Sequence, residues 1–160
     1  MNMYEYFERN CELIKREQYR EYSLSNETKK ILCDIGLPKE PLNFIQFNID
    51  EIEIELNDSY VVIGNDFGTD ICINDKDEII SIDKENEYPI RFVNKSLKDL
   101  LECIFIYKQY EQEINNAEDD DIESILDEIR MKFKIVDKEV FNNEENWWSI
   151  ILEQIESGMM

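Results

Sequence analysis

The sequence holds 160 residues, a length that suits one ordinary domain. It carries 38 Asp and Glu against 17 Lys and Arg, so its formal net charge is -21. A surface this acidic repels the phosphates of nucleic acids and of anionic membranes, so we expect neither as a direct partner. The charge would attract a basic protein and speed its association. A high carboxylate content also serves solubility alone, and both interpretations stay open.

Composition and cysteine use indicate an ordered protein that stays inside the cell. Hydrophobic residues make up 42% of the sequence, which is enough to fill a core. The first residues show neither the basic nor the apolar stretch of an export signal, and no apolar run reaches the length of a membrane span. We therefore expect a cytoplasmic protein with reduced, mostly buried thiols. The four cysteines are Cys11, Cys33, Cys72 and Cys103.

The first part of the chain is predicted to be helical. Residues 4–22 carry apolar side chains near helical spacing and predict an amphipathic helix. A second, short helix is expected over 26–35. Gly36 can adopt the left-handed conformation that ends a helix, and Pro38 prevents its continuation.

The middle of the chain changes to a period of two, which is typical of strands. Residues 52–56 alternate strictly between apolar and charged side chains, as a half-buried strand does. Because short turns separate most of the apolar segments here, we expect an antiparallel meander. The other strands are predicted at 43–47, 60–63, 70–73, 78–82 and 90–93.

The last third returns to helical spacing. Ser96 and Asp99 resemble a capping box and predict a helix that runs to about residue 114. Residues 115–121 are interpreted as an acidic linker, and helices are expected over 122–133 and 144–156. Adjacent helix positions point about 100° apart, so one residue of the pair Trp147-Trp148 can lie in the core and the other at its margin. Packing is favoured for both, with an exposed interface anchor as the alternative.

This order of elements predicts an α+β fold. We expect a single domain over 1–160 with a central, mostly antiparallel, twisted sheet of about five to six strands. N-terminal helices would occupy 1–36, the sheet 42–93 and C-terminal helices 96–157.

The residues that most catalytic and metal sites need are missing. The sequence has no histidine, which excludes Ser-His-Asp and Cys-His sites and removes the commonest zinc ligand. It has no Cys-x-x-Cys pair, and its four glycines form no phosphate-binding motif. We predict no catalytic residue, no cofactor and no metal ion. A hydrolase that uses paired carboxylates is the enzymatic alternative, because so many acids supply candidates.

Three acidic segments can be interpreted as functional or as structural. Residues 66–68, Asp-Phe-Gly, spell the magnesium motif of protein kinases, but its companion motifs are absent and a tight turn is favoured. Asp75 and Asp77 could open a calcium loop, yet Ile80 stands where that loop needs glycine, so a hairpin turn is favoured. Residues 118–121 are favoured as a linker and helix start, with a contact to a cation or a basic protein as the alternative.

The order of several short motifs resembles one known family. Gly36-Leu37-Pro38 follows a helix and precedes strand residues Phe44 and Phe47. The later segments are YVVIGND at 60–66, DICI at 70–73, EIISID at 78–83 and FVNKSL at 92–97, before a late helix that carries Trp148. Over residues 30–155 this order is similar to the SUKH superfamily, the Smi1/Knr4-like group. It is nearest to the SUKH-4-like bacterial immunity proteins.

The resemblance implies an α+β fold without shared catalytic residues. It further implies a protein that binds and neutralises a cognate polymorphic toxin by covering its active or substrate-binding face. That toxin is expected to be a basic nuclease domain. A non-catalytic regulatory or scaffolding adaptor of the same superfamily is the alternative, and the sequence leaves the oligomeric state open.

The family supplies no universal contact residues for the partner. We therefore choose acids and one aromatic residue from segments expected to be exposed loops, where binding residues often lie. The chosen residues are Asp66, Phe67, Asp70, Asp75, Asp77, Glu118, Asp119, Asp120 and Asp121.

Overall fold

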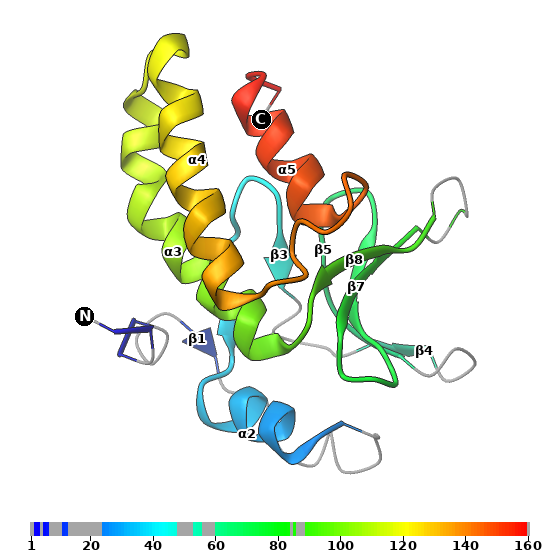
Figure 1. Cartoon of the computed structure of the whole chain (residues 1–160). Coiled ribbons are helices and arrows are strands. Elements are labelled where there is room, and N and C mark those ends of the chain that lie inside the picture. The colour runs from blue at the N-terminus through cyan, green and yellow to red at the C-terminus, as the bar shows by residue number, and fades with distance from the viewer. Residues whose placement is uncertain are drawn as a thin grey trace.

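The computed structural model describes residues 2–3, 5–6, 24–47, 60–83, 85 and 89–159 in full, and the backbone alone of 11–12 and 53–55. Within these residues an antiparallel sheet is covered by helices, which confirms the predicted α+β class (Figure 1). None of the helices described there has the length and hydropathy that a membrane crossing needs. The elements are β1 (Cys11–Glu12), α2 (Asn26–Asp34), β2 (Leu37–Pro38), β3 (Gln46–Phe47), β4 (Glu53–Glu55), β5 (Tyr60–Asn65), β6 (Asp70–Ile73), β7 (Ile79–Ile82), β8 (Arg91–Asn94), α3 (Leu97–Asn116), α4 (Asp119–Val136) and α5 (Trp147–Glu156).

The main sheet follows the predicted meander. Strands β5, β6, β7 and β8 pair in chain order, and every pairing is antiparallel. Both β3 and β4 pair with β5, so the sheet has six strands in five positions. Gly64 permits the pairing with β3, because a Cβ at this position would lie 2.4 Å from the Gln46 carbonyl oxygen. Strand β3 is shorter than the predicted 43–47, since Leu42 and Ile45 pair with each other around a turn.

The N-terminal helix predicted over 4–22 is wrong as one continuous element. Residues 3, 5 and 6 are helical, but Cys11–Glu12 form a short strand that pairs antiparallel with Leu37–Pro38. Its partner strand lies 25 to 27 residues later in the chain, since Cys11 is opposite Pro38 and Glu12 is opposite Leu37. Helical spacing alone could not reveal that competing pairing. The remainder of the predicted helix lies outside the described residues.

The helix ends follow the predicted capping signals, with one exception. Gly36 adopts φ 82° after α2, and the Ser96 hydroxyl accepts a hydrogen bond from the Asp99 backbone N–H, 3.1 Å away, at the start of α3. The exception is the acidic linker expected over 115–121. It is limited to residues 117–118, because Asp119, Asp120 and Asp121 form the first turn of α4. Carboxylates are stabilised there by the helix dipole, so the run of acids starts a helix rather than interrupting one.

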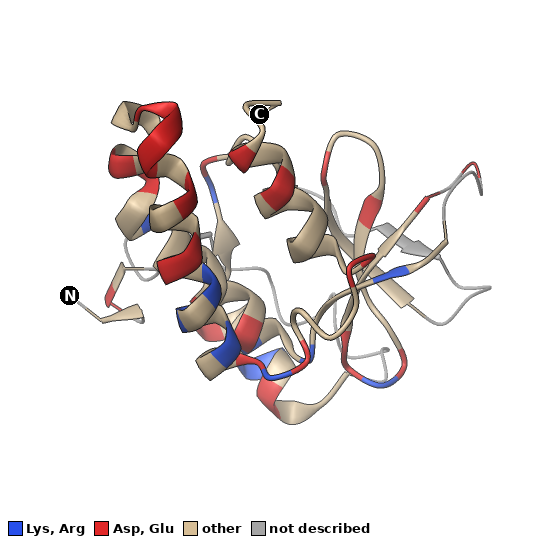
Figure 2. Ribbon diagram, turned by 45° about the horizontal axis from the view of Figure 1, so that its top comes forward, with Lys and Arg blue, Asp and Glu red and all other residues tan. Residues whose placement is uncertain are grey.

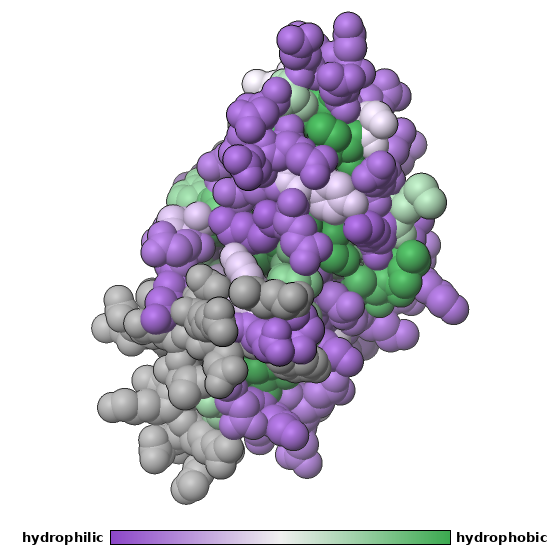
Figure 3. Space-filling model, turned by 90° about the vertical axis from the view of Figure 1, so that its left-hand side faces the viewer, coloured by the Kyte–Doolittle hydropathy of each residue, from purple (hydrophilic) through white to green (hydrophobic). Residues whose placement is uncertain are grey.

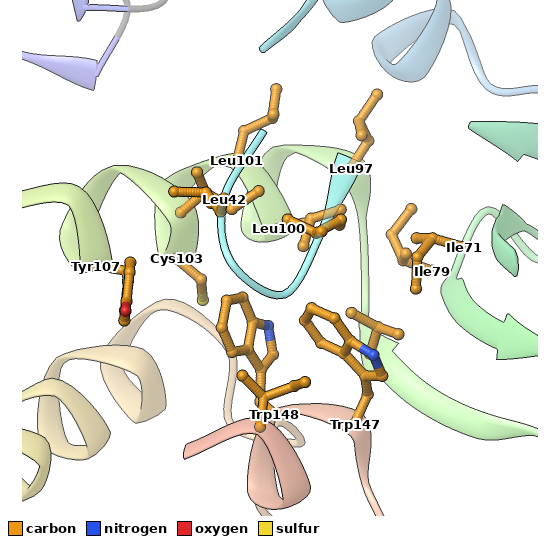
Figure 4. Packing of buried hydrophobic residues seen from close by; sticks show 14 of the residues in the cluster. Leu42, Ile71, Ile79, Leu97, Leu100, Leu101, Cys103, Tyr107, Trp147 and Trp148 are labelled. Atoms are coloured by element: carbon orange, nitrogen blue, oxygen red, sulfur yellow. The ribbon is translucent and has the colours of Figure 1, made fainter. Parts of the chain in front are cut away.

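The core lies between the sheet and helices α3, α4 and α5 (Figure 4). Trp147 and Trp148 are 2% and 0% exposed, so both indoles are core residues. Their ring centroids lie 4.8 Å apart, and Phe44 contacts both rings edge-on at 5.9 and 5.5 Å. Each such aromatic contact stabilises the folded state by about 0.5–1.5 kcal/mol, in addition to the stabilisation from burying its apolar area. This cluster joins α5 to the segment before β3.

A buried polar network joins α5 to the sheet. The Trp148 Nε1–H donates to the side-chain oxygen of Asn94 at the end of β8, 2.8 Å away. The Asn94 amide in turn donates to the Asp137 carboxylate at 3.1 Å, and the Lys95 backbone N–H donates to the same carboxylate oxygen at 2.9 Å. Asn94 is 0% and Asp137 3% exposed. Because burial raises the cost of an unmatched polar group, this network fixes how β8, the end of α4 and α5 meet.

The two tryptophans provide a matched test of this network. Trp148→Phe removes the donor to the fully buried Asn94 oxygen, whereas Trp147→Phe removes a donor to the part-exposed carboxylate of Asp66, which water can reach. An unmatched buried acceptor costs about 1–3 kcal/mol. We therefore expect Trp148→Phe to lower the free energy of unfolding by about 1–2 kcal/mol more than Trp147→Phe, measured by urea denaturation. Equal losses would show that the Asn94 network contributes nothing of its own.

Candidate protein-binding surface

The loop between β5 and β6 is organised around the Asp66 carboxylate. One of its oxygens accepts hydrogen bonds from the backbone N–H groups of Gly68 and Thr69, and the other accepts the Thr69 hydroxyl at 2.8 Å. The Trp147 Nε1–H donates to this second oxygen at 2.9 Å. Asp66 therefore holds the loop in shape and joins it to α5. The tight turn favoured for the Asp-Phe-Gly segment is confirmed.

Phe67 follows Asp66 in an uncommon conformation. Its φ is 68° and its side chain is 62% exposed. A bulky residue in this left-handed region carries strain of about 1–3 kcal/mol, which persists only where the surrounding contacts over-determine the backbone. Here those contacts are the hydrogen bonds of Asp66 and one from the Phe67 N–H to the Asn65 side chain at 3.1 Å. The loop thus holds an aromatic ring in solvent on a fixed backbone.

Other exposed groups lie at the same end of the sheet as Phe67. The Thr69 hydroxyl bonds that of Ser81, Ser81 pairs with Arg91, and the Arg91 guanidinium lies 3.4 Å from the Glu145 carboxylate. Figure 1 shows the β5–β6 loop, the start of β8 and the segment before α5 at this end of the sheet, and Figure 2 shows the β5–β6 loop apart from the segment before α5, which lies beside β8. We call five of the exposed residues at this end the loop-end surface, namely Phe67, Glu85, Ile90, Glu144 and Glu145.

The turn between β6 and β7 lies at the opposite end of β6 and fixes α2. Asp77, with φ 67°, accepts hydrogen bonds from the Ser25 backbone N–H at 3.1 Å and from the hydroxyls of Ser25 and Thr28. Ser25 is the N-cap of α2, so the carboxylate adds acceptors where a helix start needs them. Asp75 in the same turn is exposed. The hairpin turn favoured from the sequence is confirmed.

The remaining residues chosen from the sequence lie elsewhere. Asp70 is half-buried at the start of β6, where it pairs with Asn65 and Ile82. The acids at 118–121 are all exposed at the tip of the α3–α4 hairpin, which both Figure 1 and Figure 2 show apart from the β5–β6 loop. The fold therefore distributes the nine residues over three separate places and does not assemble them into one site.

A metal site and a catalytic cleft make different demands on the described acidic residues. No group of three or more Cys, Asp or Glu in it could hold a metal ion. Burial raises the pKa of the Asp99 carboxyl, and the negative charges of Asp137 and Glu102 add to that rise. Asp99 lines neither the hollow of about 400 Å³ beside α3 nor that of about 360 Å³ between α2 and α3. It stands in the first turn of α3.

Comparison with known proteins decides the family. The model of the SUKH-4 immunity protein family matches residues 10–154, which are 145 of the 160 positions. The chain belongs to the SUKH-4 immunity protein family. Neither a curated protein nor a solved structure matches it. For this SUKH-4 protein, membership implies a toxin as the cognate partner, so the surface features above are candidates for a protein interface.

Sequence reasoning identified Phe67 but missed its neighbours. Ile90 is 64% exposed, and Glu144 and Glu145 come from a segment more than 50 residues later. No local pattern indicates that these residues share one end of the sheet, because their proximity depends on strand pairing and on the bond between Trp147 and Asp66. The informative local signal was an aromatic residue between Asp and Gly in a hairpin loop.

The β6–β7 turn offers a test that separates structural from exposed acids. In the variant Asp77→Asn the new residue also tolerates a positive φ. Its side-chain NH2 group, a donor, replaces one of the two carboxylate oxygens that accept hydrogen bonds from Ser25 and Thr28. We expect this variant to lower the free energy of unfolding by about 1–2 kcal/mol. The matched change Asp75→Asn alters an exposed side chain. It should change the free energy of unfolding by no more than about 0.5 kcal/mol. Urea denaturation measures both, and a neutral Asp77→Asn would contradict the structural role.

Proposed function

We propose that this chain is an immunity protein that binds and neutralises a cognate polymorphic toxin by covering the toxin's active or substrate-binding face. Membership of the SUKH-4 immunity protein family carries this proposal. The sequence supports action by binding alone, since it has no histidine and no phosphate-binding glycine motif. Inhibition by coverage needs only a complementary surface and no reacting group.

The charge supports a basic nuclease as the toxin. A nuclease binds phosphates through Arg and Lys, and a protein of net charge -21 offers carboxylates that can occupy those positions. Opposite charges also steer the two proteins together, which matters when a toxin must be captured before it acts. We place this encounter in the cytoplasm, where the nucleic acid of the cell is exposed to such an enzyme.

The nine residues chosen from the sequence divide into two roles in this proposal. Asp66 and Asp77 already accept several hydrogen bonds within the chain, so they shape the loops that carry their neighbours. Phe67, Asp75 and the acids at 118–121 are exposed and are free to face a partner. Asp70 supports the β5–β6 loop from the first position of β6.

Co-expression with the toxin encoded beside the gene tests the proposal. Cells that carry the toxin and this chain should grow, whereas cells that carry the toxin and an unrelated immunity protein should not. The purified pair should elute as one complex in gel filtration at moderate salt. Growth arrest in the presence of this chain, together with the absence of a complex, would contradict the proposal.

Salt dependence tests the electrostatic part separately. The association rate constant should fall by at least about tenfold between 50 mM and 500 mM NaCl, because screening removes long-range steering. The dissociation rate constant should change much less. Surface plasmon resonance with a catalytically inactive toxin measures both rate constants. An association rate constant that does not change with salt concentration would exclude charge steering.

A further inference from the structure

We propose that the loop-end surface docks onto a basic face of the partner protein that contains an apolar pocket, and that Phe67 is the side chain that enters this pocket. The proposal rests on the proposed function, because it assigns the surface through which the chain would bind its toxin. It commits to a protein whose exposed charge is positive around an apolar hollow.

Two exposed apolar side chains mark this surface. Among all the described residues five large hydrophobic side chains are exposed, and Phe67 is the aromatic one among them. Aromatic side chains that enter a pocket supply much of the binding energy of protein interfaces. Ile90, 64% exposed, adds a second apolar group at the same end of the sheet. Strands β6 and β8 are two sheet positions apart, about 10 Å, which is within the width of one interface.

The backbone of Phe67 is held ready for binding. A turn with φ 68° accommodates glycine or asparagine without strain, yet an exposed phenylalanine occupies this position. The fold gains little from an exposed ring, so the strain is best explained by a use of the side chain outside the chain itself. The Asp66 hydrogen bonds and the Trp147 contact fix the loop before any partner arrives. A preorganised anchor loses less conformational entropy on binding.

The charges of the loop-end surface favour a basic partner. Glu85, Glu144 and Glu145 are exposed at the loop-end surface, and the nearby cation, Arg91, bridges to Glu145 at 3.4 Å. Among the described residues of this surface, the net charge is therefore negative beside two apolar groups. Such an acidic rim complements Arg and Lys on the partner and repels nucleic acid.

A second exposed apolar pair provides the matched control. Met131 and Ile135 lie one turn apart on α4 and are 68% and 82% exposed. Three exposed lysines and three exposed acids stand near them, namely Lys132, Lys134, Lys138, Asp127, Glu128 and Glu139. Figure 2 shows Lys and Arg positions along the C-terminal half of α4, and Figure 3 shows that the face formed by α3 and α4 is mostly hydrophilic with separate apolar patches. Because these charges nearly balance, they would favour a basic partner less than the acidic loop-end surface does.

The test measures the affinity of four variants for one probe. The probe is a catalytically inactive form of the toxin domain encoded beside the gene, titrated by isothermal calorimetry. We expect Phe67→Ala to raise Kd at least about 30-fold and Ile90→Ala to raise it about fivefold. The Kd of Met131→Ala and of Ile135→Ala should stay within about threefold of the wild-type value. Circular dichroism of each variant confirms that the fold is kept.

A fifth variant separates lost contact from lost stability. Phe67→Gly relieves the backbone strain, so it should raise the urea midpoint of unfolding while it weakens binding as much as Phe67→Ala does. Unchanged affinity of both Phe67 variants, with wild-type binding intact, would overturn the proposed surface and leave the proposed function standing. A loss confined to the Met131 and Ile135 variants would overturn it in favour of α4. A wild-type chain that fails to bind the probe would overturn both proposals.

Discussion

The hydrogen bond between the Trp148 indole and the Asn94 amide is the contact on which the arrangement of this protein depends. Asn94 has no exposure to solvent, so its amide must be satisfied within the core, by Trp148 on one side and Asp137 on the other. That requirement fixes α5 against β8. The neighbouring Trp147 then reaches Asp66 and sets the shape of the β5–β6 loop. The buried network thus determines the geometry of a surface loop, and the loop carries the aromatic residue proposed to contact the partner.

Features of this fold that depend on neighbours in sequence were predictable, and those that depend on distant pairs were not. The Gly36 cap, the Ser96 cap and the alternating strands follow from local rules, and all are present. By contrast, β1 pairs with a strand 25 to 27 residues away, and Asp77 bonds a serine 52 residues earlier. The bond between Trp147 and Asp66 spans 81 residues. Nothing in the local sequence distinguishes such acids from those that remain exposed.

The acidic composition therefore has two different physical uses. Asp66, Asp77 and Asp137 accept internal hydrogen bonds and hold loops and helix ends in place. The exposed carboxylates create a long-range negative electrostatic potential, which repels nucleic acid and attracts basic proteins. Family membership gives that field a meaning, because a SUKH-4 immunity protein must recognise a toxin. The exposed aromatic ring on a preorganised loop supplies the short-range contact that charge alone lacks, and charge without such a contact gives little specificity.

Hydrogen–deuterium exchange of the chain, alone and in complex with an inactive form of its toxin, shows which surface the toxin covers. Amide protection on binding should concentrate in the β5–β6 loop, at the start of β8 and in residues 142–146. The tip of the α3–α4 hairpin and the exposed face of α4 should exchange as they do in the free chain. Protection confined to α4 or to the hairpin tip, with the β5–β6 loop unchanged, would contradict the account.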